Sequence, residues 1–429
     1  MSSLRRFGMK LGNDRMRCLV DRLGNPERRY GIAHVTGTKG KGSTTALIAS
    51  LLRSHGFRTG SYFSPYVYDL RERIQLDGRM ISREAFAAQA ARLVPVLEGI
   101  HGSSLGPVTE FEFKTALGFT YFANEAADYA AVEVGIGGRL DATNVVDPLV
   151  SVITNVGLDH RDVLGNTHEE IAAEKAGIIK PRRPVVTAVE HGGARDVVDR
   201  TASEAESPLI SVGPPVGQIG CVSRWDVEWS GDAETFAIRT PSRTYPALTL
   251  RLRGDHQRLN AACAVAALEV MAASEGFSVS ESAVRQGLAA VELPGRMSVL
   301  QTEPLVIADG AHNGLSARML AREVRSIPHE RLHLVIGMLR GHDPDDLLSE
   351  LGPLAHRVYA TAPSWHRALE ARLIADCARS YCTEVVEIVP PIDAAMTACA
   401  AAGLRDMVLI TGSFYTVGEV TPEQLIENR

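Results

Sequence analysis

Short apolar runs alternate along the chain with longer segments in which apolar residues recur every three or four positions. The short runs predict strands, and the longer segments predict amphipathic helices. Strands that alternate with helices favour α/β layers around a largely parallel sheet. The clearest strand candidates are residues 31–35, 129–134, 150–156, 184–189, 305–308, 332–336 and 407–410. We therefore expect an α/β protein.

Capping boxes mark the starts of two expected helices. Thr109 is followed three positions later by Glu112, and Thr167 is followed in the same way by Glu170. In this pattern the hydroxyl and the carboxylate each accept a hydrogen bond from the other residue's backbone N–H, which satisfies two donors at a helix start. Further helices are expected at residues 260–273 and 281–290.

The stretch from Pro214 to Arg253 has a different pattern. Its apolar residues approach alternation with a period of two around turn residues, which indicates antiparallel strands. The residues that carry this pattern are Trp225, Val227, Trp229, Phe236, Ile238, Tyr245, Leu248, Leu250 and Leu252. We expect a small antiparallel β insertion here.

A domain boundary is expected at LPGRM, because Pro294 and Gly295 interrupt the regular pattern before strands and helices resume. This divides the chain into one domain at residues 1–294 and a second at residues 298–429. A chain of 429 residues is long enough for two hydrophobic cores.

Composition and charge narrow the kinds of molecule that the protein is expected to bind. The formal net charge of -6 does not indicate a nucleic-acid-binding surface. No uninterrupted apolar stretch is long enough to span a bilayer, and the N-terminal basic residues precede no apolar signal segment. The 6 cysteines form no CxxC pair, which favours reduced thiols over a zinc site. We expect a cytoplasmic protein that acts on a small molecule or a protein.

The stretch GTKGKGS at residues 37–43 joins an expected strand to a helix that begins near Ser43. Glycine-rich backbone at a helix N-terminus suits polyphosphate, with Lys41 on the β- and γ-phosphates and Ser43 on Mg²⁺. A strict Walker pattern fails, because Val35 occupies the first glycine position and Gly42 separates Lys41 from Ser43. The alternative is a glycine-rich turn with solvated lysines. The expected ATP-binding residues of this stretch are Thr38, Gly40, Lys41, Gly42, Ser43 and Thr44.

Polar residues follow two further strands. Glu133 lies near the end of one, and Asp159 and His160 follow another. A carboxylate at the carboxyl end of a parallel strand faces the ligand crevice of an α/β sheet, where it suits a hard cation. By spacing alone, however, His160 is a loop imidazole and Lys175 is a helix-end lysine that the macrodipole favours.

Ten motifs together resemble the folylpolyglutamate synthase and bifunctional dihydrofolate synthase family of the Mur ligase superfamily. In order they are GTKGKGS, YFSPYVYDLRERI, TEFE, EVGIGGRLDATN, ITNVGLDHRDVLG, EKAGIIKP, GDHQRLNAA, LPGRM, DGAHN and TGSFYTVGEV, between residues 7 and 420. The resemblance implies a P-loop domain with a mainly parallel sheet flanked by helices, and a smaller Rossmann-like α/β C-terminal domain. It also implies a monomer.

The activity that the resemblance implies is ATP-dependent amide ligation. A carboxylate of dihydropteroate or a reduced folate would become an acyl phosphate, and the amino group of L-glutamate would then displace phosphate. The implied cofactors are ATP and Mg²⁺ at two sites. The implied metal ligands are Ser43, Glu133, His160 and Lys175, the last as a carbamate, and the implied catalytic residues are Lys41, His160, Lys175 and Arg296.

The resemblance assigns further binding residues by motif. Asn260 matches a contact to adenine and Arg296 a contact to the terminal phosphates, while Asp309 and His312 match other nucleotide contacts. For the acceptor side, the positions that match glutamate-binding residues are Ser64, Arg73 and Ser413, and Tyr66 resembles the wall of a pterin pocket. A guanidinium is a natural bidentate partner for a carboxylate.

Three departures from the family pattern occur: one adds charge beside the expected phosphates, and the other two bear on the substrate. Lys39 replaces a usual asparagine, YDLRERI replaces a more common RFNERI, and DGAHNGLSA lacks a proline after its asparagine. The sequence therefore leaves two other hypotheses open: a related ligase that joins an amino acid to a non-folate carboxylate, and a nucleotide-binding module without catalysis. It also leaves open the choice between dihydropteroate and reduced folates, and the number and linkage of the glutamates added.

Overall fold

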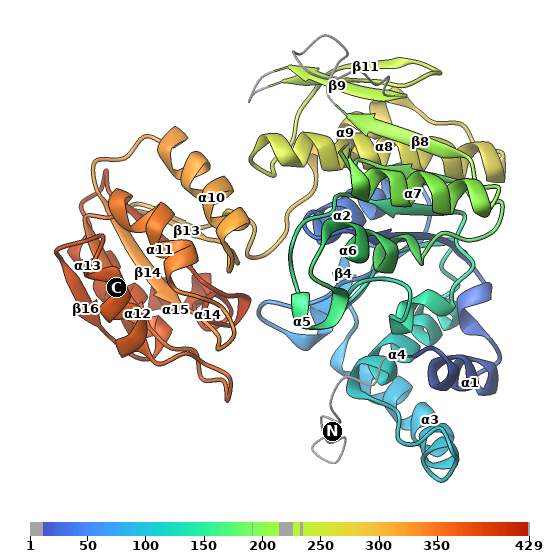
Figure 1. Ribbon diagram of the computed structural model, residues 1–429, viewed down its shortest axis with the longest axis horizontal. Coiled ribbons are helices and arrows are strands. Elements are labelled where there is room, and N and C mark those ends of the chain that lie inside the picture. The colour runs from blue at the N-terminus through green and yellow to red at the C-terminus, as the bar shows by residue number, and fades with distance from the viewer. Residues whose placement is uncertain (1–11, 191, 214–225, 232–234, 428–429) are drawn as a thin grey trace. The chain divides into compact units, whose positions relative to one another are not determined.

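The computed structural model describes residues 12–190, 192–213, 226–231 and 235–427, and the predicted insertion position Trp225 lies outside them. The chain divides into two units. The first unit comprises Met1–Pro65, Arg71–Arg251 and Asp255–Val291, and the second comprises Tyr66–Leu70, Leu252–Gly254 and Glu292–Arg429. Each unit is built around its own sheet (Figure 1).

Among its described residues, the first unit has one 11-stranded sheet in the order β11-β10-β9-β8-β7-β6-β1-β5-β2-β3-β4. Pairing is parallel from β2 through β5, β1, β6, β7 and β8 to β9. The strands are β1 Gly31–Thr36, β2 Thr59–Tyr62, β3 Ile74–Leu76, β4 Arg79–Met80, β5 Tyr129–Glu133, β6 Val150–Ile153, β7 Val185–Thr187, β8 Leu209–Gly213, β9 Val227–Gly231, β10 Phe236–Arg239 and β11 Thr244–Leu248. The central strands are almost entirely buried, as expected for parallel strands covered on both faces.

Helices flank this sheet, and α8 lies along α2 (Figure 1). Both predicted capping boxes are present, at Thr109 with Glu112 and at Thr167 with Glu170. The helices are α1 Asp14–Arg22, α2 Lys41–Ser54, α3 Arg83–His101, α4 Glu110–Asn124, α5 Arg161–Leu164, α6 His168–Ala176, α7 Gly193–Glu204, α8 Asp255–Glu275 and α9 Glu281–Ala289, and the 3-10 turns of the chain are Pro26–Arg28, Leu70–Arg73, Ala142–Val145 and Gly352–Leu354. α8 begins at Asp255, five residues before its predicted start at Asn260.

The predicted antiparallel insertion is confirmed within the described residues. β9 pairs antiparallel with β10, and β10 pairs antiparallel with β11. The sequence did not indicate how the insertion attaches to the rest of the unit. β9 pairs in parallel with β8, so the insertion lengthens the main sheet instead of forming a separate one.

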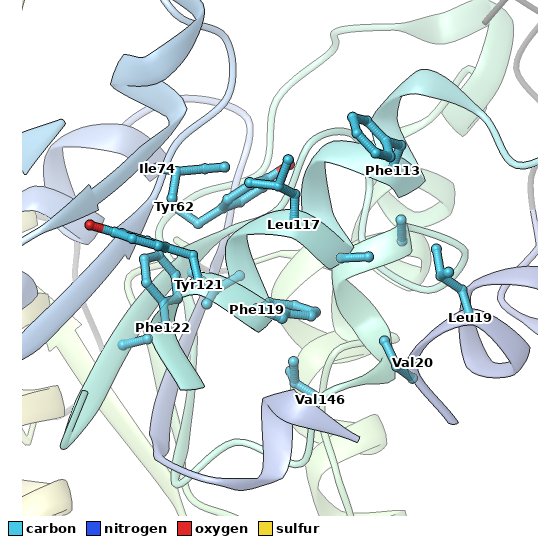
Figure 2. Close-up of a cluster of buried hydrophobic side chains, with 14 of the residues drawn as sticks. Leu19, Val20, Tyr62, Ile74, Phe113, Leu117, Phe119, Tyr121, Phe122 and Val146 are labelled. Carbon is cyan, nitrogen blue, oxygen red and sulfur yellow. The ribbon is translucent and has the colours of Figure 1, made fainter. Parts of the chain in front are cut away.

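An aromatic-rich core packs α1, α3 and α4 onto one side of the sheet (Figure 2). Tyr62 comes from β2, and Phe113, Phe119 and Phe122 come from α4. The Tyr62, Phe119 and Phe122 side chains are fully buried. Large buried aromatic rings contribute much of the apolar area that stabilises a core, so this cluster fixes α4 against the strand that leads into the YFSPY motif.

A buried ion pair reinforces the start of α4. The Arg15 Nε atom lies 2.7 Å from the Glu112 Oε2 atom, and the two side chains are only 8% and 5% exposed. The same carboxylate accepts a hydrogen bond from the Thr109 backbone N–H at 2.7 Å. Glu112 therefore joins α1 to the N-terminus of α4 as well as closing its capping box.

Substituting Glu112→Ala is expected to lower the free energy of unfolding by about 3 kcal/mol, because it leaves the Arg15 guanidinium buried without its carboxylate. The matched control is Glu125→Ala, whose partner Arg58 is 46% exposed in a surface ion pair. That change is expected to cost only about 0.5 kcal/mol. Urea denaturation of both variants measures the difference, and equal losses would contradict the structural role of the buried pair.

The described part of the second unit has a 6-stranded sheet in the order β12-β13-β17-β14-β15-β16. All pairs are parallel except β12 with β13, and apolar clusters lie on both faces. Its strands are β12 Ser298–Thr302, β13 Leu305–Ala308, β14 Leu332–Gly337, β15 Arg357–Thr361, β16 Val385–Glu387 and β17 Met407–Thr411. Its helices are α10 Gly314–Ser326, α11 Asp345–Leu351, α12 Ala371–Ala378, α13 Pro391–Ala401, α14 Phe414–Val417 and α15 Pro422–Glu427.

Two smaller expectations are also addressed by the structure. Five described cysteines, at positions 18, 263, 377, 382 and 399, are free thiols, while Cys221 lies outside the described residues. Across the described part of the chain, no helix combines the length and the apolar character needed to cross a membrane.

Candidate active site

The glycine-rich loop lies between β1 and α2, at the carboxyl end of a central strand. Gly40 has a φ of 82° and immediately precedes Lys41, the first residue of α2. A Cβ atom at Gly40 would lie 2.4 Å from the Asn260 Oδ1 atom, so this position requires glycine for space as well as for conformation. The contact also shows that the tertiary fold brings Asn260, on α8, against this loop.

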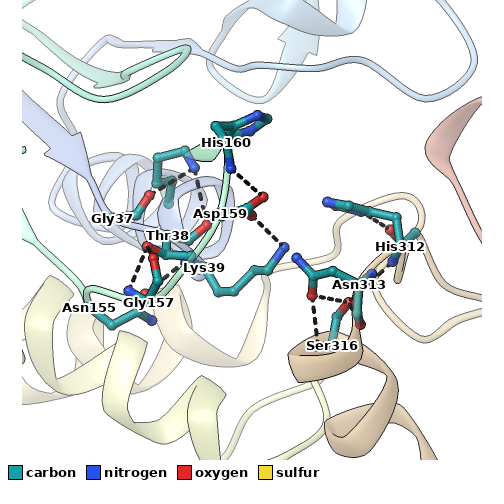
Figure 3. A network of polar contacts seen from close by, with 12 residues as sticks. Gly37, Thr38, Lys39, Asn155, Gly157, Asp159, His160, His312, Asn313 and Ser316 are labelled. Atoms are coloured by element: carbon teal, nitrogen blue, oxygen red, sulfur yellow. Dashed lines mark hydrogen bonds and ion pairs between the residues drawn. The ribbon is translucent and has the colours of Figure 1, made fainter. Parts of the chain in front are cut away.

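Hydrogen bonds hold the loop to the segment that follows β6 (Figure 3). The Thr38 hydroxyl donates to the Gly157 carbonyl at 3.1 Å and accepts from the Gly157 N–H at 2.9 Å. The Lys39 N–H donates to the Asn155 Oδ1 atom at 2.8 Å. These bonds order the loop backbone, and an ordered backbone binds an anion without a further entropic cost.

The two lysines of the loop have different partners. The Lys41 Nζ atom donates to the Gly37 carbonyl at 3.0 Å and to the Thr38 carbonyl at 3.4 Å, so its ammonium lies over the loop. The Lys39 Nζ atom lies 3.2 Å from the Asp159 Oδ2 atom, with side chains 19% and 13% exposed (Figure 3). The extra charge at Lys39 is therefore paired with a carboxylate from the GLDH segment.

Glu133 is the last residue of β5 and lies against the start of α2. Its carboxylate Oε2 atom accepts the Ser64 N–H at 2.9 Å, and the residue is 3% exposed. A Cβ atom at Gly42 would lie only 3.3 Å from the same Oε2 atom. Gly42 therefore brings a buried carboxylate close to the helix turn that carries Ser43, a combination that suits a hard cation.

Lys175 and His160 lie in the same positively charged environment. Lys175, on α6, is 3% exposed. Burial, together with the nearby charge of Lys41, lowers the pKa of Lys175 to about 7. His160 precedes α5 with a φ of 50°, and burial lowers its pKa while the Asp159 carboxylate opposes that shift. The fold thus gathers Lys39, Lys41, His160, Lys175 and Asp159 within electrostatic reach of one another.

The unmodified side chains of this region offer few ligands for a divalent cation. Among the described residues, no group of three or more His, Cys, Asp and Glu side chains could hold a metal ion. The predicted set has one hydroxyl, one carboxylate and one imidazole, from Ser43, Glu133 and His160. A carbamate on Lys175 would supply a second anionic ligand of the kind that Mg²⁺ prefers.

Arg73, predicted for the acceptor side, lies beside two neighbouring aromatic rings. Its Cζ atom is 5.8 Å from the centre of the Tyr62 ring and 5.6 Å from that of Phe111, and the residue is 7% exposed. The rings hold the planar guanidinium by cation–π attraction. No role was predicted for Tyr62 from the sequence, although it belongs to the same YFSPY motif as the predicted residue Ser64. Ser64 lies in the first unit, whereas Tyr66 belongs to the second.

Apart from Tyr66, the predicted residues of the second unit lie in three loops. Asp309 accepts the Met297 N–H at 3.0 Å through Oδ2 and the Ala311 N–H at 2.9 Å through Oδ1. It therefore links the segment that carries Arg296 to the DGAHN loop. The His312 Nδ1 atom is 2.8 Å from the Gly310 carbonyl (Figure 3). Ser413 caps α14 by accepting the Thr416 N–H at 3.0 Å.

The first unit, with its glycine-rich loop on a mainly parallel sheet, and the smaller α/β unit together have the architecture of a Mur-type ligase. Residues 35–268 match the Mur ligase middle domain, and residues 295–414 match the Mur ligase, glutamate ligase domain. These two matches correspond to the body of each unit.

Curated relatives and solved structures are similar to this chain over nearly its whole length. The dihydrofolate synthase/folylpolyglutamate synthase of Bacillus subtilis (strain 168) is 36% identical, over 97% of this chain and 95% of its own. The Escherichia coli FolC structure in complex with DHPP and ADP has a TM-score of 0.87 at 31% identity, covering 100% of this chain and 96% of its own. Folylpolyglutamate synthase of Thermotoga maritima has a TM-score of 0.84 at 33% identity, covering 98% and 94%. The chain belongs to the folylpolyglutamate synthase/dihydrofolate synthase family of Mur ligases.

Proposed function

We propose that this protein is an ATP-dependent ligase that joins L-glutamate to the carboxyl group of dihydropteroate, a reduced folate, or both. The observation that carries the proposal is the hydrogen-bonded glycine-rich loop, with Lys41 over it and the buried Glu133 carboxylate beside the start of α2. Family membership supports the choice of acceptor and amine. Solved relatives are described with DHPP and ADP, and with Mn, AMPPNP and L-glutamate.

The reaction has two balanced steps. A carboxylate oxygen of the acceptor attacks the γ-phosphorus of ATP, the bond to the β-phosphate oxygen breaks, and an acyl phosphate and ADP form. The glutamate amine then attacks the acyl carbon, loses a proton and expels phosphate. Because two anions approach each other in the first step, the site must neutralise charge as it develops.

The chain supplies that neutralisation from several segments. We assign the phosphates to the loop residues Thr38, Gly40, Lys41, Gly42, Ser43 and Thr44. Asn260 is assigned to adenine, and Arg296, Asp309 and His312 to further nucleotide contacts. Ser43, Glu133, His160 and carbamylated Lys175 would hold Mg²⁺ at two sites, and the ions would draw negative charge from the phosphate oxygens.

On the acceptor side, Ser64, Arg73 and Ser413 are assigned to glutamate, and Tyr66 to the pterin pocket. Arg73 is the best supported of these by its surroundings, because its guanidinium is buried against two aromatic rings. A fixed guanidinium loses little further entropy when it binds a carboxylate bidentately. The family resemblance also supports a monomer that acts in the cytoplasm on small molecules.

Mass spectrometry of the products tests the assignment. The purified protein is incubated with ATP, Mg²⁺ and L-glutamate, with dihydropteroate in one reaction and a reduced folate in the other. Gain of glutamate on dihydropteroate alone would define a dihydrofolate synthase, and gain on both acceptors would define the bifunctional enzyme. Reactions without ATP are the control. No gain on either acceptor, with ATP still consumed when other carboxylic acids are supplied, would contradict the folate assignment.

A further inference from the structure

The ring of Phe414 lies directly beneath the Arg296 guanidinium in the second unit. The Arg296 Cζ atom is 4.5 Å from the centre of the ring, well within the range of cation–π attraction. Phe414 is the first residue of α14 and follows the capping residue Ser413. The residues after β17 thus place an aromatic ring against a side chain of the LPGRM segment, which is far away in the sequence.

The two segments that carry candidate nucleotide-binding residues, LPGRM and DGAHN, both pack against this ring. A Cβ atom at Gly310 would lie 2.4 Å from the Phe414 Cε1 atom, and one at Gly295 would lie 3.1 Å from it. The Gly310 N–H also donates to the Gly295 carbonyl at 2.9 Å. Two glycines therefore allow the backbones of LPGRM and DGAHN to pack against one side chain, and the His312 ring lies 6.5 Å from its centre.

The stack leaves the hydrogen-bonding capacity of Arg296 unused. Within the described residues, its side chain makes neither a hydrogen bond nor an ion pair, and the Phe414 ring is its recorded partner. A guanidinium carries five N–H donors, and stacking on a ring face uses none of them. A long arginine side chain otherwise samples many rotamers, so holding it in advance lowers the entropic cost of binding an anion.

We propose that Phe414 is a positioning residue that holds the Arg296 guanidinium with its donors available for a phosphoryl group. The inference rests on the proposed function, in which Arg296 contacts the nucleotide phosphates. Phe414 itself touches no reacting atom. Its effect on turnover passes through Arg296, so the two residues must be energetically coupled in catalysis.

A double-mutant cycle tests that coupling. The variants are Phe414→Leu, Arg296→Ala and the two combined, and initial rates are measured at varied ATP concentration. Phe414→Leu is expected to lower kcat by about tenfold with a smaller change in KM, because the stack preorients a group that acts on developing charge. In the Arg296→Ala background the same substitution is expected to lower kcat by less than about twofold.

Controls separate positioning from a general packing effect. Phe414→Met, which also lacks a ring, is measured in parallel in case Phe414→Leu does not fold, and thermal unfolding reports the integrity of each variant. Phe57→Leu removes a ring that packs against Tyr129 and Phe277 in the first unit. That variant is expected to change kcat by less than about twofold in either background.

The outcomes distinguish this inference from the function on which it rests. If Arg296→Ala is impaired but loss of the Phe414 ring costs as much in that background as in the wild type, the positioning role is wrong and the proposed function stands. If Arg296→Ala keeps wild-type kcat, the assignment of Arg296 to the phosphates is wrong, and the role of Phe414 fails with it.

Discussion

The Lys41→Ala variant is expected to lose at least about a hundredfold in kcat, the scale expected when a preorganised electrostatic group is removed from a reacting centre. The Lys41 ammonium lies over the loop backbone, held by the Gly37 and Thr38 carbonyls. Under the proposed function, this ammonium stabilises the charge that develops as the γ-phosphoryl group is transferred. Release of ADP in the presence of glutamate and the acceptor measures the loss.

Lys39→Asn is the matched comparison for Lys41→Ala. The two lysines belong to one loop and carry the same charge, but the Lys39 ammonium is paired with Asp159 at 3.2 Å. Its removal is expected to lower kcat by less than about tenfold, since this partly exposed pair contributes little by itself. Wild-type activity in Lys41→Ala would contradict the nucleotide site. A larger loss in Lys39→Asn than in Lys41→Ala would show that the wrong lysine had been assigned.

The Lys175→Ala variant is expected to lose about a hundredfold in kcat, because it removes an anionic ligand from the proposed metal site. Formate or acetate in solution is expected to restore part of the activity, since a short carboxylate resembles the carbamate and the truncated side chain leaves space for it. Lys175→Arg is the control: a guanidinium does not form a carbamate, so added carboxylate is expected to restore nothing. An unimpaired Lys175→Ala variant would show that Lys175 is not needed.

The proposed carbamate on Lys175 is expected to form in a pH-dependent way. Burial lowers the pKa of its amine to about 7. Only the neutral amine attacks carbon dioxide, and the product carbamate forms with release of a proton, so occupancy is expected to rise from pH 6 to pH 8. Carbon-13 NMR with labelled bicarbonate measures the carbamate signal in wild type. The same signal in Lys175→Ala would assign it to another amine.

Local patterns predicted much of the first unit correctly. The capping boxes at Thr109 and Thr167 depend on residues only three positions apart, so their hydrogen bonds could be inferred from the sequence. The buried central strands were visible as apolar runs for a similar reason, although the run at 150–156 ends as a strand at Ile153. Short strands such as β3 and β16 were missed because their pattern is too brief to stand out from loops.

The sequence by itself determined the kind of chemistry: an ordered set of motifs, a glycine-rich loop with Lys41 and Ser43, and a strand that ends in Glu133. It did not determine which distant residues come into contact, because such contacts depend on how the layers pack. The Lys39–Asp159 pair joins residues 120 positions apart, and neither sequence segment indicates the other. Only the tertiary structure showed that Lys175 is buried and that the pKa of its amine is lowered. It also decided that Phe414 lies under Arg296, because burial and stacking arise only when separate segments close on one another.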